Sequence, residues 1–236
     1  MSTQETVKLP DNAKLVTVAK EPILKEVTAA SLKLSLKEML KENFVILHCK
    51  TRNSPIINLI LITWEYYGSK SKKMHVKESN DFDGKPKLEY ENGKYFEGAA
   101  SIATYLLLSG RSKHNMTDSF ESTKAQIFQW LFYALNEVKP PVYSWVTESK
   151  GFQRSKIETI KIMTRLNDLL LTQTYLVGER MSCADISMAA ILLPAVQNAL
   201  LNTDDSYCNL LRWLNTCLAQ PEFIQVLGTI KLAKVK

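Results

Sequence analysis

Hydrophobic and polar positions follow two different patterns along the chain, and the first of them begins near residue 43. Residues 44–49 (FVILHC) form a short apolar run that is typical of a buried strand. Ser54 and Pro55 then open an apolar segment that Gly68 closes. Serine favours the N-cap of a helix, proline favours its first position, and glycine favours the position after its last turn. We therefore expect a strand followed by a helix.

Further strands and a second helix complete this region. Apolar and polar residues alternate over residues 72–77, which indicates a strand. Asn92 and Gly93, the usual pair in a type I′ turn, lie between two more short segments with strand character. Together these elements predict a thioredoxin-like α/β domain over residues 43–110. The elements expected after the first helix are a strand at 72–77, a helix or loop at 80–84, strands at 87–90 and 94–96, and a helix at 98–110.

The later pattern, over residues 117–232, has helical periodicity only. Asp118 with Glu121, and Ser182 with Asp185, have the spacing of a capping box, in which two side chains satisfy free N–H groups at the start of a helix. The segment after Asp185 is apolar on all sides, as expected of a central buried helix. An all-α domain is therefore expected here.

Two details of the helical region carry specific expectations. Pro140 and Pro141 should end or kink the first long helix, because proline lacks an N–H and clashes with the preceding turn. Residues 155–171 should form a helix with one buried stripe. The stripe is expected to consist of Ile157, Ile160, Leu166 and Leu170.

Residues 1–42 form a separate N-terminal extension in this interpretation. Leu32, Leu36, Met39 and Leu40 recur near the helical period, and lysines occupy the other positions. The pattern predicts a short amphipathic helix. Two interpretations stay open, since this helix can pack on its own domain or dock on a partner.

Composition and charge narrow the class of protein. The chain has 236 residues, of which 45% are hydrophobic and 23% are charged, as in an ordinary globular protein with a core. The net charge of +6 is spread along the chain and favours encounter with RNA, acidic proteins or anionic membranes without selecting one. Residues 186–193 are too short an apolar run to span a membrane, and the polar start shows no signal peptide. We expect a cytoplasmic protein that is not bound to a membrane.

Cysteine and histidine positions argue against a metal site. Cys49, Cys183, Cys208 and Cys217 include no C-x-x-C pair. The three histidines, His48, His75 and His114, are scattered and match no ligand or triad spacing.

The order of the two regions and three motifs resemble the glutathione transferase fold, with an α/β thioredoxin-like domain followed by an all-α domain. Residues 84–90 (GKPKLEY) and 92–106 resemble the family segment in which a cis-proline precedes a strand, a hairpin and an acidic-Ser helix start. The resemblance implies that Pro86 is that cis-proline. Residues 174–186 resemble the family's turn and its N-capping box, with Ser182 and Asp185 as the capping pair.

The last segment resembles a branch of this family found in translation proteins. Residues 212–232 are similar to the end of the transferase-like domain of elongation factor 1 gamma, and to the domain appended to some valyl-tRNA synthetases. Residues 105–110 resemble part of the methionyl-tRNA synthetase extensions. The match in the last segment is carried by Arg212, Trp213, Thr216, Cys217, Gln220, Pro221, Phe223, Val226, Leu227 and Gly228.

This resemblance implies a non-catalytic assembly module without a cofactor. Its expected partners are translation elongation factor subunits or aminoacyl-tRNA synthetases, bound as a homodimer or heterodimer through the transferase-like fold. Trp130, Phe132, Tyr133, Tyr143 and Trp145 are either core residues or interface anchors in this interpretation.

An enzyme is the alternative that the same resemblance offers. A glutathione transferase would use Ser54 to hold the thiolate, although Ser54 also serves as an N-cap. The backbone of Lys87 and Leu88 would pair with the tripeptide, and Glu97 would begin the helix that holds its γ-glutamyl group.

One position departs from the family pattern, because Glu97 is followed by Gly98 where serine or threonine is expected. The missing charge-assisted hydrogen bond is worth about 1.5–3 kcal/mol, which argues for a degenerate site. Cys49 is the other candidate nucleophile, but its place in an apolar strand predicts an inert thiol.

A third hypothesis is an RNA-binding cofactor, for which lysines at 70–73 and 231–236 would contact phosphates. Direct RNA binding is not expected, because no aromatic residues are interleaved with these lysines.

Overall fold

The computed structural model describes residues 44–68, 72–80, 84–91, 93–109, 121–147, 152–199, 207–230 and 232. The predicted helix of the N-terminal extension, His114 and the capping residue Asp118 lie outside the described residues.

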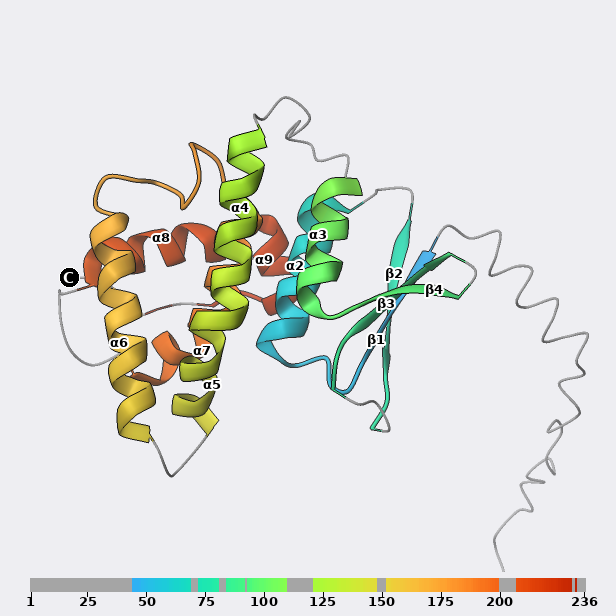
Figure 1. The fold of residues 1–236 in the computed structure, drawn as a ribbon, viewed down its shortest axis with the longest axis horizontal. Helices are drawn as coiled ribbons and strands as arrows, with labels where there is room; N and C mark the ends of the chain where they lie inside the picture. Colours follow the sequence, from blue (N-terminus) through green and yellow to red (C-terminus); the bar gives the residue numbers. More distant parts are fainter. Residues whose placement is uncertain are drawn as a thin grey trace, which may run out of the picture. The chain divides into compact units, whose positions relative to one another are not determined.

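A four-stranded mixed sheet forms the centre of the α/β region (Figure 1). Its order is β2-β1-β3-β4, with β1 parallel to β2 and the other pairs antiparallel. In β1 the side chains of Val45, Leu47 and Cys49 are buried and alternate with half-buried ones, so one face of the sheet faces the core. The strands are β1 (Phe44–Cys49), β2 (Lys73–Glu78), β3 (Lys87–Glu91) and β4 (Lys94–Glu97), each within one residue of its predicted bounds.

Two helices, α2 (Pro55–Tyr67) and α3 (Ala99–Ser109), cover that core face of the sheet (Figure 1). The Ser54 side chain accepts a hydrogen bond from the Ile57 N–H at 3.3 Å, which makes it the N-cap predicted from the sequence. Only residues 79–86 connect β2 to β3. Within the described ranges, no helix covers the opposite face of the sheet, and Lys73, His75 and Lys77 are exposed there.

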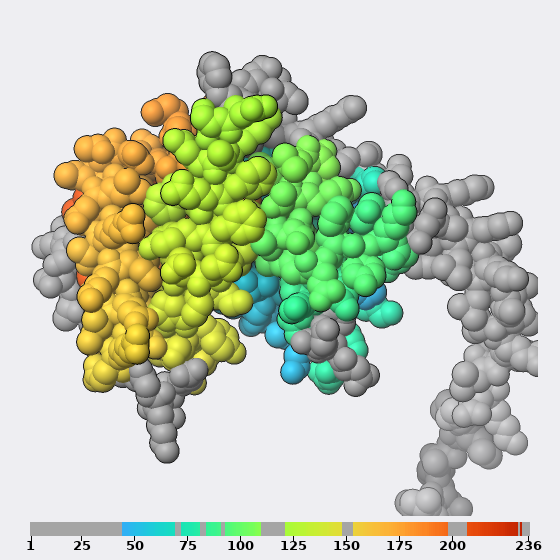
Figure 2. Space-filling model, viewed as in Figure 1, coloured from blue at the N-terminus to red at the C-terminus, as the bar shows by residue number. Residues whose placement is uncertain are grey.

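The helical region packs around α7 (Cys183–Ala199), whose residues 183–193 are all buried. This agrees with the central helix that its apolar sequence predicts. On the face shown in Figure 2, the surface of α4 lies between those of α3 and α6. The other elements are α4 (Glu121–Tyr133), η2 (Ala134–Val138), α5 (Lys139–Thr147), α6 (Phe152–Leu169), α8 (Cys208–Leu218) and α9 (Pro221–Leu227).

The interruption of the first long helix falls before its two prolines rather than at them. Residues 134–138 form a π turn, closed by the Lys139 N–H donating to the Ala134 carbonyl. Helical structure then resumes through Pro140 and Pro141 in the first turn of α5, where a missing N–H costs least. The wider turn accommodates the prolines without ending the helix.

The buried stripe of α6 differs from the predicted one. Ile157 is 52% exposed, whereas Thr159 is fully buried together with Met163, Leu166 and Leu170. Thr159 is accommodated because its hydroxyl donates to the Ser155 carbonyl at 2.8 Å, leaving its methyl group to pack.

The start of α7 carries the reciprocal hydrogen bonds of a capping box. The Ser182 N–H donates to Asp185 Oδ2 at 2.9 Å, and Ser182 Oγ accepts from the Ala184 N–H at 3.2 Å. Asp185 Oδ1 accepts two more, from the Leu176 N–H and from Trp213 Nε1, each at 2.9 Å. One carboxylate thus ties α7 to the preceding loop and to α8.

Candidate functional site

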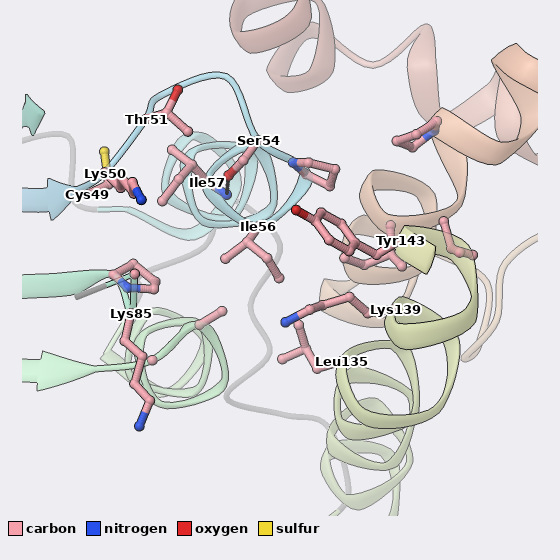
Figure 3. A pocket seen from close by; sticks show the side chains of 18 of the residues that line it. Cys49, Lys50, Thr51, Ser54, Ile56, Ile57, Lys85, Leu135, Lys139 and Tyr143 are labelled. Atoms are coloured by element: carbon pink, nitrogen blue, oxygen red, sulfur yellow. Dashed lines mark hydrogen bonds between the residues drawn. The ribbon is translucent and has the colours of Figure 1, made fainter. Parts of the chain in front are cut away.

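A cleft of about 950 Å³ opens between the α/β region and the helical region (Figure 3). Its α/β wall consists of the loop between β1 and α2, the turn before β3 and the start of α3, and its helical wall consists of η2, α5 and part of α7. The polar side chains that bear on its chemistry are those of Cys49, Lys50, Ser54, Lys85, Lys139 and Tyr143.

Ser54 occupies the α/β wall, and it has a second role as the N-cap of α2. Its backbone is extended, which is the usual N-cap conformation, and its oxygen faces the Ile57 N–H. The hydroxyl donates no hydrogen bond to any described residue, so its proton is available to a ligand in the cleft. The structure therefore leaves both predicted roles of Ser54 in place.

Lysines give the cleft a positive charge. Lys50 and Lys85 come from the α/β wall and Lys139 from the helical wall, and no Asp or Glu of the described residues lines the cleft. Figure 3 shows the Tyr143 hydroxyl pointing from α5 toward the wall that holds Ser54. Such an arrangement favours an anionic ligand.

Gly98 marks the start of α3 on the cleft, and its backbone explains why it is a glycine. Its φ of +85° is a conformation that side chains with a Cβ disfavour. Nothing lies within 4 Å of where a Cβ would stand, so space is not the constraint. The Gly98 N–H donates to the Pro86 carbonyl at 2.8 Å, and the Gly98 carbonyl accepts from the Ile102 N–H. The hydroxyl that the family pattern expects is absent here for a conformational reason.

Pro86 lines the cleft, but the expectation of a cis-proline is wrong for this structure. The described part of the chain contains no cis peptide bond, so the bond between Lys85 and Pro86 is trans. The cis expectation came from the family pattern, and the residues themselves permit either isomer.

Three predicted glutathione-binding residues lie away from the cleft lining. Leu88 is fully buried in the core. Lys87 Nζ lies 3.8 Å from Glu97 Oε2 and 5.6 Å from the centre of the Tyr95 ring, on the face of the sheet opposite α2. Ser54, Pro86 and Gly98 line the cleft, whereas Lys87, Leu88 and Glu97 do not, and the backbone contact expected of Lys87 and Leu88 stays a prediction.

Cys49 ends β1 at the edge of the cleft but is poorly suited as a nucleophile. Its side chain is 2% exposed. Burial, with a smaller effect from the Glu78 carboxylate, raises the pKa of the Cys49 thiol. The thiolate, which is the reactive form, is therefore disfavoured.

Sequence reasoning missed most of the helical wall. The sequence gives no local signal for Lys139, and it indicates Tyr143 only as one of five aromatic residues that are either core or interface. Of those five, Trp145 is buried, Trp130 and Tyr133 are half-buried, and Phe132 and Tyr143 are exposed. The adjacent prolines were the one local signal of an irregular helix at this place.

Other classes of site find no support among the described residues. No three side chains of His, Cys, Asp or Glu in those residues gather as metal ligands would. No helix within the same ranges combines the length and apolar character needed to cross a bilayer.

Comparison with known proteins gives two kinds of match in sequence. A model of the family described as "Glutathione S-transferase, C-terminal domain" matches residues 136–221. Elongation factor 1-gamma of Danio rerio is 34% identical over 158 residues, and that of Homo sapiens is 31% identical over 165 residues. Each match covers 63% of this chain and 35% of the relative, so the chain spans about a third of the length of these curated relatives.

Solved structures give a match that covers most of this chain. A glutathione S-transferase of class Gtt2 from Vibrio parahaemolyticus has a TM-score of 0.65 at 15% identity, covering 78% of this chain and 100% of that one. Ure2p5 from Phanerochaete chrysosporium, cocrystallized with 1-(S-glutathionyl)-2,4-dinitrobenzene, has a TM-score of 0.68 at 17% identity, covering 78% and 93%. At these identities the likeness is one of fold.

Proposed function

We propose that this chain, which has the glutathione transferase fold, is a non-catalytic assembly module of the translation machinery. It binds translation elongation factor subunits or aminoacyl-tRNA synthetases in the cytoplasm. The observation that carries the proposal is the 31–34% identity to elongation factor 1-gamma over 63% of the chain. This identity is about twice that to the solved transferase structures, which favours the translation branch over an enzyme.

The cleft supports a module without chemistry of its own. Gly98 supplies no hydroxyl at the start of α3, and the buried Cys49 thiol is disfavoured as a nucleophile. Ser54 is accounted for by its role as the N-cap of α2. Each side chain that the family would use for catalysis thus has a structural explanation or is missing.

Exposed apolar residues on α3 and α4 support pairing with a second transferase-like fold. Leu108 is 63% exposed and Phe132 is 46% exposed, and both line a hollow together with Phe96 and Tyr105. Large apolar side chains gathered on a surface favour a protein interface. The proposed mode of assembly is a homodimer or heterodimer.

Affinity capture tests this function. The tagged chain is recovered from an extract of cells that express it, at moderate and at high salt and with RNase, and bound proteins are identified by mass spectrometry. We expect stoichiometric recovery of elongation factor subunits or aminoacyl-tRNA synthetases in all conditions. Recovery of the chain alone contradicts the proposal.

A glutathione transferase remains the second candidate, because the Ser54 hydroxyl, three lysines and the start of α3 meet on one cleft. As an enzyme, the chain binds glutathione in calorimetry and conjugates it to a 1-halo-2,4-dinitrobenzene, with Ser54 Oγ donating to the thiolate that displaces the halide. Ser54→Ala then abolishes conjugation, while Ser122→Ala, which removes an exposed hydroxyl of α4 outside the cleft, leaves it unchanged.

A further inference from the structure

The strand β2 ends the sheet on one side, and its outer edge has no strand partner among the described residues. The Ser79 N–H donates to the Cys49 carbonyl at 3.0 Å, and the register of β2 against β1 is regular along its length. Backbone groups alternate in direction along a strand. The N–H and C=O groups of Met74, Val76 and Glu78 therefore point away from β1, where a further strand can pair with them.

A hollow of about 470 Å³ lies beside this edge, between β2, α2 and α9. Leu61 and Trp64 of α2 and Val226 of α9 provide apolar surface in its lining. A side chain that points from an added strand toward the helices would enter this hollow. The edge thus combines free backbone groups with a place for apolar side chains.

Cations surround the same edge. Arg52 and Lys72 line the hollow, where Glu65 is the one carboxylate of the described lining, and the exposed Glu78 ends β2. Lys73, His75 and Lys77 are exposed on the face of the sheet opposite α2, at intervals of about 6.6 Å along the strand. An added strand would present every second side chain to this row.

We propose that the free edge of β2 binds an extended acidic segment of a partner protein as a fifth strand. Its acidic side chains alternate with apolar ones, so that the former face the row of Lys73, His75 and Lys77 and the latter enter the hollow. Main-chain hydrogen bonds provide affinity in this mode of recognition, and alternate side chains provide specificity. The proposal rests on the assembly function and names the surface and the kind of partner that serve it.

The backbone favours a peptide over a nucleic acid as the occupant. The edge offers N–H donors and C=O acceptors in alternation, and a peptide strand satisfies both. A phosphate chain has acceptors only, so it would leave the carbonyl groups of the edge unpaired. Leu61, Trp64 and Val226 in the lining of the hollow likewise offer contacts to aliphatic side chains.

Fluorescence anisotropy with a labelled peptide tests strand addition. The probe is a peptide of roughly eight residues that alternates Glu and Val, long enough to span β2. Two further versions carry N-methyl groups on the odd or on the even residues. We expect one methylated version to bind about tenfold or more weakly and the other to bind like the parent, because only alternate N–H groups pair with β2.

Two results of this assay would overturn the proposal. The first is equal binding of all three peptides, which would indicate charge attraction without strand pairing. The second is tighter binding of an oligouridylate of similar charge than of the parent peptide, which would make the surface a nucleic-acid site.

Charge variants of the whole chain provide a matched control. Lys73→Glu with Lys77→Glu reverses two exposed charges of β2, and Lys94→Glu with Lys161→Glu makes the same change of net charge on β4 and α6. We expect the β2 pair to weaken the peptide about tenfold or more and the control pair to weaken it less than about twofold. Equal weakening by both pairs contradicts the proposal, and circular dichroism establishes that each variant is folded.

Affinity capture with the same variants separates this surface from the function on which it rests. Loss of the partner with the β2 pair alone supports both. If the variant with both β2 substitutions still recovers the partner, the edge of β2 is not the binding surface, and the assembly function stands. If neither the parent chain nor any variant recovers a partner, the assembly function is wrong. The peptide assay then decides whether the edge of β2 binds an acidic strand.

Discussion

The Tyr67 hydroxyl accepts a hydrogen bond from the backbone N–H of Cys183 at 3.0 Å, across the boundary between the α/β and helical regions. Cys183 is the first residue of α7, so its N–H is one of the groups that the helix itself cannot pair. The neighbouring Tyr66 hydroxyl donates to the Met181 carbonyl at 2.6 Å. Two adjacent tyrosines at the end of α2 thus fix the start of the central helix.

Replacing Tyr67 by phenylalanine keeps the ring and removes the hydrogen bond. The Cys183 N–H is then buried without its partner, and we expect the free energy of unfolding to fall by about 1–3 kcal/mol. Urea unfolding followed by circular dichroism measures the difference. Tyr95→Phe is the control, because Tyr95 is 57% exposed. Equal stability of the two variants would show that the hydrogen bond contributes nothing.

Asp185 makes stability depend on pH. Burial raises the pKa of its carboxyl in the folded chain, despite the hydrogen bonds from Leu176, Trp213 and Ser182 that lower it. In the unfolded chain the pKa is about 4. A raised folded pKa means that the contribution of the carboxyl is complete below the unfolded pKa and is lost as pH rises through the folded pKa.

We therefore expect the parent chain to lose stability relative to Asp185→Asn as the pH rises above about 4. The asparagine variant does not titrate. It is less stable at every pH, because its NH2 group, a donor, faces the Ser182 N–H, which is also a donor. The measurement is urea unfolding of both chains across a pH series. If the difference in free energy of unfolding between the two chains stays constant with pH, or grows in favour of the parent, the pKa of Asp185 is not raised in the folded chain.

The positive φ of Gly98 disfavours any residue that has a Cβ. Every substitution there should therefore lower the free energy of unfolding by a similar amount. We expect Gly98→Ala and Gly98→Ser to lower the free energy of unfolding equally, by about 1–2 kcal/mol. Ala100→Ser, which adds a hydroxyl within α3, is the control and should cost less than about 0.7 kcal/mol. Thermal unfolding of the three variants measures these differences. A stable Gly98→Ser chain would mean that the positive φ carries no penalty.

The four cysteines differ in accessibility, and this gives a direct chemical test. Cys49, Cys183 and Cys217 are buried, and burial raises the pKa of each thiol, that of Cys183 to about 12. Cys208 is exposed. In the native chain we expect one thiol to react readily with an aromatic disulfide reagent, and all four to react in urea. Cys208→Ser should abolish the native reaction.

Elements with local signals at their ends were predicted well. Ser54, Pro55 and Gly68 gave α2 to the residue, because caps act over a single turn. The stripe of α6 was predicted in part: Leu166 and Leu170 are buried, but Ile157 is exposed and the buried Thr159 is absent from the predicted stripe because its side chain is polar. Polarity alone does not predict exposure in a helix, because a threonine hydroxyl can donate to a backbone carbonyl of its own helix.

The cleft was predicted only in part, and for a related reason. Ser54 and Gly98 begin helices, so local pattern places them at the ends of strands. Lys139 and Tyr143 reach the same cleft only because α7 packs against both α5 and α2, and these contacts span many residues of sequence. No local pattern encodes such a contact. The hydrogen bond between Tyr67 and Cys183 was missed for the same reason.

The π turn at 134–138 sets the rotational phase of everything that follows it in the helix. It holds one residue more than an α-helical turn, so Lys139 and Tyr143 are rotated by about 100° from where a continuous α-helix would place them. Deleting one residue of the turn would give a continuous α-helix and keep both side chains on the cleft, whereas an α-helical turn without the deletion would rotate them away from it. The composition of the helical wall therefore depends on the length of one turn as much as on the identity of its residues.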